Sequence, residues 1–69
     1  MIEYKAEHLI LGRGLRYRAR TIDFAIDQLV DTIAEKISED GRTLVGGIQF
    51  SRSTNRVGTV KLVARAVAQ

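Results

Sequence analysis

Arginine is the residue type best placed for chemistry in this 69-residue chain, and it is concentrated ahead of a predicted helix. The stretch of residues 12–20 reads GRGLRYRAR. Guanidinium groups bind two oxygens of a phosphate or carboxylate at once, and glycines let a backbone approach an anion closely. The spacing therefore indicates anion binding. The guanidinium groups would come from Arg13, Arg16, Arg18 and Arg20, and the backbone would approach the anion closely at Gly12 and Gly14.

The residues that catalysis would need do not form a recognisable group. His8, the only histidine, falls on the apolar face of a predicted strand, and the chain has no cysteine. No serine or threonine has an evident base partner, and no P-loop occurs. The letters GRGLRY begin like a dinucleotide-binding fingerprint, but Tyr17 stands where the third glycine belongs. We therefore expect no enzymatic activity, no metal and no cofactor.

Apolar periodicity predicts one helix and three strands. Alternation over Ile2–Leu11 predicts a strand, and an apolar stripe of helical spacing predicts a helix that Thr21 caps and that ends before Gly41. Two further strands are predicted at Thr43–Phe50 and Val57–Val67, joined by a turn at Ser51–Arg56. The glycine pair at 46 and 47 indicates a bulge in the second strand. The helical stripe consists of Ile22, Ile26, Leu29, Val30, Ile33 and Ile37.

This order of elements predicts a single α+β domain over residues 1–69, with the plan β-α-β-β. A right-handed crossover makes the first two strands parallel, and the third strand fits between them, antiparallel to both. The expected sheet is three-stranded and mainly antiparallel, with order 1-3-2 and the amphipathic helix on one face. Alternatively, residues 15–20 form a short extra strand after a hairpin turn at Gly12–Gly14.

Parallel first and second strands would bring two arginine-rich loops to one edge of the sheet. The loop after the second strand holds Arg52 and Arg56, and the helix N-terminus at Thr21 would lie between the two loops. Free amide groups and the helix dipole attract anions at such a terminus. Tyr17 has an arginine on either side, an arrangement that suits stacking on a nucleotide base.

A small core and segregated charge favour a homo-oligomer. A chain of this size buries only about 60% of its unfolded surface, so further burial against a copy would stabilise it. Residues 21–40 carry six acids and one lysine, while ten of the eleven basic residues lie outside this segment. Acids four apart form a ridge that is either a solvated outer face or a surface that a neighbouring subunit's arginines contact. We expect four apolar residues to lie at an interface: Leu9, Leu11, Phe24 and Val63.

The residues EYK at 3–5, EDGRTLVGG at 39–47 and the final strand VKLVARA resemble the domain-of-unknown-function family 4177. That resemblance implies a strand–helix–strand–strand plan in a short bacterial or phage protein, and no activity. Arg42 stands where that family has an aromatic residue. The plan is also similar to the dodecins, hollow flavin-binding oligomers. They stack flavin on a tryptophan, and this chain has none, so the resemblance implies an assembly without flavin.

The sequence thus predicts a non-enzymatic, homo-oligomeric protein of the cytoplasm that captures a phosphate-bearing small molecule such as a nucleotide. Sequestering a signal in a bacterial or phage setting is one such role. Two alternatives stay open: a nucleic-acid-binding protein that uses the same arginines, and a purely structural oligomerisation module. No apolar run is long enough to span a membrane, so we expect no membrane partner.

Overall fold

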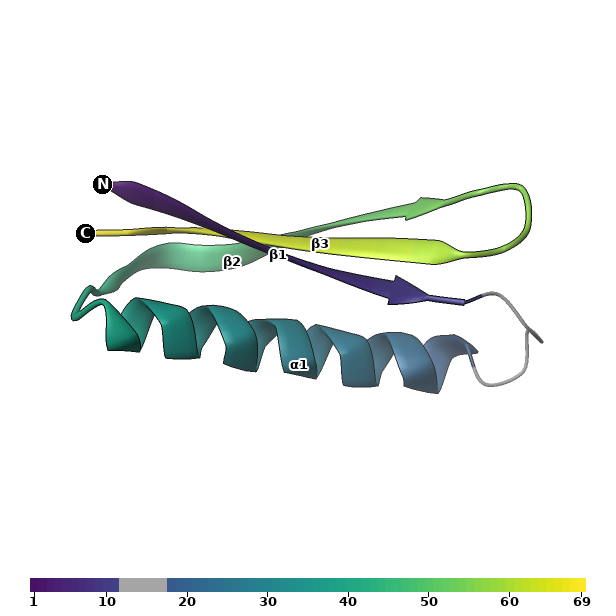
Figure 1. The fold of residues 1–69 in the computed structure, drawn as a ribbon, viewed down its shortest axis with the longest axis horizontal. Coiled ribbons are helices and arrows are strands. Elements are labelled where there is room, and N and C mark those ends of the chain that lie inside the picture. The colour runs from purple at the N-terminus through teal and green to yellow at the C-terminus, as the bar shows by residue number, and fades with distance from the viewer. Residues whose placement is uncertain (12–17) are drawn as a thin grey trace.

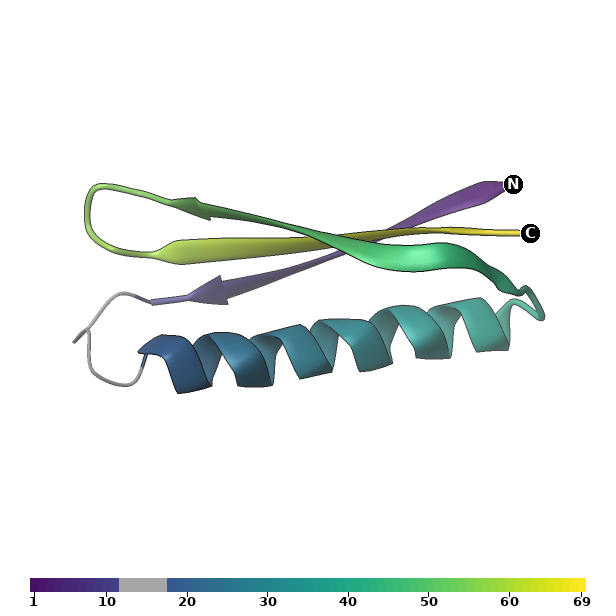
Figure 2. The same cartoon turned by 180° about the vertical axis from the view of Figure 1, so that it is seen from behind.

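The computed structural model describes residues 1–11 and 18–69, the side chains of residues 18 and 19 excepted. It contains strand β1 (Ile2–Ile10), helix α1 (Arg18–Glu39), strand β2 (Leu44–Thr54) and strand β3 (Val60–Ala68). Strand β3 lies between the other two and is antiparallel to both, so the sheet order is β1-β3-β2. The helix covers one face of the sheet (Figures 1 and 2). The predicted α+β fold and strand order are confirmed.

The core lies between α1 and the face of the sheet that we call the inner face, to which Val60, Leu62 and Ala64 of β3 belong. Residues directly opposite on antiparallel strands share a face. Tyr4 and Ala6 of β1, which pair with Ala66 and Ala64, are therefore inner residues. Alanines on β3 let the helix approach the sheet closely, and four helical residues complete the buried set: Ala25, Leu29, Ile33 and Ile37.

The helix begins three residues before the predicted N-cap. Residues 18–20 are helical, which excludes the predicted extra strand over that part of residues 15–20, and Thr21 lies inside the helix. Arginine and alanine have high helix propensity, so the helix extends back through Arg18 and Arg20. The prediction of Thr21 as N-cap was therefore wrong.

The helix ends where the sequence predicted. Gly41 has a φ of 69°, a left-handed conformation that glycine adopts without a steric penalty. The Gly41 N–H donates to the Ser38 carbonyl at 3.0 Å, and the Arg42 N–H donates to the Ile37 carbonyl at 3.0 Å. These two bonds form a Schellman motif and satisfy carbonyls at the helix C-terminus.

The β2–β3 hairpin differs from the prediction. Residues 51–54 continue β2, and the turn spans residues 55–59, so β3 begins at Val60 instead of Val57. The Asn55 side-chain oxygen accepts hydrogen bonds from the N–H groups of Val57 at 3.1 Å and Thr59 at 2.9 Å. These hydrogen bonds fix the position of the turn at Asn55. Residue propensities alone did not predict that position.

The predicted bulge in β2 is confirmed. Val45 pairs with Val67 and Gln49 with Arg65, so four steps along β2 match two steps along β3. Gly46, whose φ is 74°, supplies the conformation that the bulge requires. Beyond the bulge the pairing is regular as far as Thr54 opposite Val60.

A polar contact joins β1 to the end of the helix. The Tyr4 hydroxyl donates a hydrogen bond to Asp40. This bond, burial and the Asp40 charge raise the pKa of Tyr4 above its usual value of 10.0, while the charge of Arg42 acts in the opposite direction. The contact therefore favours the protonated phenol in the folded state.

We expect the free energy of unfolding of Tyr4→Phe to fall less steeply than that of the wild type as the pH rises into the alkaline range. Because folding raises the pKa, this stabilisation is complete below the unfolded value of about 10 and is lost as pH rises through the folded value. Urea denaturation between pH 8 and pH 11 measures the free energy of unfolding. The wild-type value should fall more steeply than that of the variant, and Tyr17→Phe serves as the matched control. Identical slopes for wild type and Tyr4→Phe would contradict the assignment.

Candidate functional site

Three chain segments meet at one end of the molecule. The end of β1, the start of α1 and the β2–β3 turn at residues 55–59 all lie there, opposite the two termini (Figure 1). The parallel arrangement of β1 and β2 causes this, because both strands run toward the same end. We call this region the basic end and define it by Arg20 and Arg56.

The predicted anion-binding residues other than Arg52 fall into three groups. Arg20 is exposed in the first turn of α1, and Arg56 is exposed in the β2–β3 turn. Arg18 is the first residue of the helix, and Thr21 is half-buried one residue after Arg20. The remaining predicted residues of the first loop lie outside the described residues: Gly12, Arg13, Gly14, Arg16 and Tyr17.

Arg52 is not in a loop. It lies within β2 opposite Leu62, which is an inner residue of β3. Its side chain therefore starts from the inner face of the sheet, beside the helix. The expected placement of Arg52 in the turn was wrong because the turn begins only at Asn55, three residues further on.

The electrostatics of the basic end are unusual for a helix N-terminus. Acidic side chains normally stabilise the first turn, because the helix dipole places positive charge there. The first turn of α1 contains no acidic residue and instead contains the basic residue Arg20. The described ion pairs, from Glu7 to Lys5 at 3.2 Å and to Lys61 at 3.7 Å, involve neither Arg20 nor Arg56. A bound anion would offset both the dipole and the arginine charges.

The predicted interface residues lie on two different surfaces. Phe24 is 61% exposed on the helix, on the side away from the sheet. Leu9 is 61% exposed and Leu11 76% exposed, while Val63 is half-buried on the outer face of the sheet. That outer face also carries Glu7, whose pKa is lowered chiefly by its hydrogen bond to Lys5.

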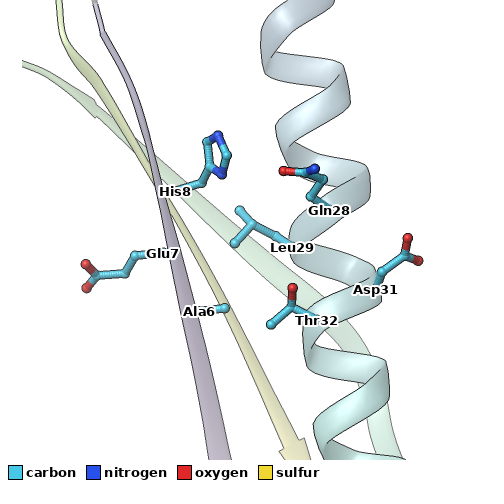
Figure 3. Close-up of a pocket in the computed structure, with 7 residues that line it drawn as sticks. All are labelled: Ala6, Glu7, His8, Gln28, Leu29, Asp31 and Thr32. Atoms are coloured by element: carbon cyan, nitrogen blue, oxygen red, sulfur yellow. The ribbon is translucent and has the colours of Figure 1, made fainter.

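Sequence reasoning missed a cleft of about 400 Å³ between β1 and the middle of α1 (Figure 3). His8 from β1 and Gln28 from the helix extend toward each other across it, whereas the carboxylates of Glu7 and Asp31 point away (Figure 3). Among the residues that line this cleft, His8 therefore has no carboxylate directed at it that would complete an acid–base pair. Hydrophobic periodicity alone could not predict that Gln28 lies beside His8, because it does not determine the position of the helix along the strand.

Within residues 1–11 and 18–69, no group of three or more histidine, aspartate or glutamate side chains could hold a metal ion. In the same part of the chain, no helix has the length and apolar character needed to span a membrane. Comparison with protein families, with characterised proteins and with solved structures found no match.

Proposed function

We propose that this protein is a non-enzymatic, homo-oligomeric binding protein that captures a phosphate-bearing ligand, such as a nucleotide, at its basic end. The observation that carries the proposal is the meeting of an acid-free first helical turn with the β2–β3 turn at one end of the molecule. Arg20 and Arg56 contribute exposed guanidinium groups from these two elements. Arginine binds phosphate oxygens in a bidentate manner, which suits this ligand class.

The segment between β1 and α1 supplies the other ligand-binding groups in this proposal. Arg13, Arg16 and Arg18 would hold phosphate oxygens, and Tyr17 would stack on a base. Arg52 is left out because it lies within a strand. A protein of this kind acts by sequestering a nucleotide signal in a bacterial or phage-infected cytoplasm.

Binding of a nucleic-acid backbone is the second candidate, because Arg20 and Arg56 are exposed at the end of an elongated molecule instead of lining an enclosed cavity. The two candidates differ in their response to salt. Each neutralised phosphate of a polymer releases counterions, so the affinity falls with a logarithmic slope of about −0.7 to −0.9 per phosphate contacted. A mononucleotide lacks this dense counterion atmosphere and its affinity should depend less steeply on salt.

Thermal denaturation of the wild-type chain tests both candidates. Pyrophosphate, ATP, a short single-stranded oligonucleotide and a short duplex are titrated in turn at low and at physiological salt. A ligand that binds only the folded state raises the midpoint temperature with increasing concentration. A shift with pyrophosphate and ATP supports nucleotide capture, and a salt-sensitive shift with polymers alone supports nucleic-acid binding. The absence of any shift would contradict the proposal.

A further inference from the structure

Strand β2 is the less protected of the two edges of the sheet. Natural edge strands avoid pairing with other chains through charged side chains, bulges or a covering element. The exposed side chains of β1 include Glu3, Lys5 and Glu7, and α1 packs most closely on β1 and β3. Residues 48–54 of β2 carry only one charge, that of Arg52, and the helix leaves Phe50 40% exposed on the inner face. The bulge protects only the first part of β2, so the edge beyond it, residues 49–54, is available for pairing.

Symmetry restricts how β2 could pair with a second copy of itself. In an antiparallel pair, opposite residues lie on the same face of the sheet. A two-fold axis perpendicular to the sheet must then pass midway between one residue and the same residue of the partner. Within the regular part of β2, the residues that could pair with themselves at this axis are Phe50, Ser51 and Arg52. Centring on Arg52 places two guanidinium groups opposite each other, which is unfavourable. Centring on Phe50 places Thr54 opposite the bulge at Gly46.

Centring on Ser51 has neither defect. It pairs residues 49–53, which lie in the regular part of β2, with the same residues of the partner, and it leaves the bulge outside the ladder at both ends. On the inner face, Phe50 lies opposite the partner's Arg52, an arrangement that permits a cation–π contact. On the outer face, Ser51 meets the partner's Ser51 and Gln49 meets the partner's Ser53, so no like charges are opposed.

The charge on the helix is complementary to this arrangement. Ala34 and Ser38 line a groove of about 350 Å³ together with Leu44 and Ile48, so they mark the side of α1 that faces β2. At 100° per residue, Asp27 lies within about 20° of Ala34 and nearer the start of the helix. Arg52 lies toward that same end of β2, because β2 runs toward the helix N-terminus (Figure 1). In a dimer the two Arg52 side chains would lie between the two helices, on the helix sides that carry Asp27.

We propose that β2 is the pairing edge of a homodimer, in which residues 49–53 of two copies form an antiparallel ladder centred on Ser51. The resulting sheet is continuous through both copies and carries both helices on the same face. The dimer specifies the interface of the proposed homo-oligomer and does not depend on ligand capture at the basic end. It uses surfaces other than Leu9, Leu11, Phe24 and Val63.

Cysteine scanning of β2 tests the dimer and its register, since the natural chain contains no cysteine. Gln49→Cys, Ser51→Cys and Ser53→Cys each place one thiol at an exposed position. With copper–phenanthroline as oxidant, Ser51→Cys should form a covalent dimer on a non-reducing gel. The other two thiols should remain largely unpaired, because their equivalents in the partner lie about 13 Å away along the strand, too far for a disulfide.

Sedimentation velocity supplies the independent readout. The wild-type chain should sediment as a dimer or as an assembly of dimers, and Ser51→Lys, which opposes two ammonium groups at the axis, should sediment as a monomer. Ser51→Thr is the matched control and should keep the wild-type mass. A monomeric wild type, or crosslinking at position 49 or 53 as rapid as at 51, would overturn the proposal. Arg20→Glu should leave the mass unchanged, so failure of the dimer is distinguishable from failure of ligand capture.

Discussion

Reversing the charge of the basic end is expected to weaken phosphate binding by roughly one to two orders of magnitude, because charge-assisted hydrogen bonds contribute on the order of 1 kcal/mol or more each. The variant combines Arg20→Glu with Arg56→Glu, which replaces two exposed donors with two carboxylates. The loss includes both the missing donors and the new repulsion of the ligand. Isothermal titration with the best ligand of the thermal panel measures the dissociation constant.

The double variant should remain folded. Glutamate at position 20 places negative charge in the first turn of α1, where it is favourable to the helix dipole by about 0.3–1 kcal/mol. Reduced binding would therefore not result from unfolding. Arg42→Glu with Arg65→Glu is the matched control, since Arg42 follows the opposite end of the helix and Arg65 lies in the middle of β3. Equal losses in the two double variants would show that net charge, and not the basic end, determines binding.

Replacing Ile33 with alanine is expected to have the largest effect on stability. Ile33 is 0% exposed and lies within the cluster formed by the helix and the inner face of the sheet. Truncation of a buried isoleucine costs about 2–5 kcal/mol, because it removes buried apolar area and leaves a cavity. Total stabilities of small domains are about 5–15 kcal/mol, with short chains at the low end. The variant should therefore be close to unfolded at ordinary growth temperature.

Urea denaturation at a fixed protein concentration measures this effect, with Glu35→Ala as the control on the exposed side of the same helix. The control should change the free energy of unfolding by less than about 0.5 kcal/mol. A loss below about 1 kcal/mol for Ile33→Ala would mean that the helix does not pack on the sheet as described.

Much of the fold could be predicted because its determinants are local. The end of the helix follows from the left-handed conformation that Gly41 permits, and the faces of the strands follow from alternation of apolar residues. The strand order follows from the crossover, which makes β1 and β2 parallel and leaves room for β3 between them, antiparallel to both. The start of the helix was missed because Thr21 is a good cap, yet the residues before it also favour the helical state.

The candidate site could be predicted only in part, because side-chain placement depends on register. One hydrogen-bonding asparagine, Asn55, shifts the turn and places Arg52 in a strand. The cleft beside His8 and the uncovered inner side of Phe50 both depend on how far the helix extends over each strand. Hydrophobic periodicity does not contain that information. The convergence of the first helical turn and the β2–β3 turn could be predicted because chain direction alone determines it.

Residue-by-residue observation of the phosphate titration tests the central claim most directly. Amide resonances of the uniformly ¹⁵N-labelled wild-type chain are recorded while pyrophosphate is added at constant ionic strength. Binding at the basic end predicts saturable shifts concentrated in residues 18–21 and 55–59, with residues near Gly41 unaffected. Shifts that are absent from both segments, or that centre on His8 and Gln28, would contradict the proposed site.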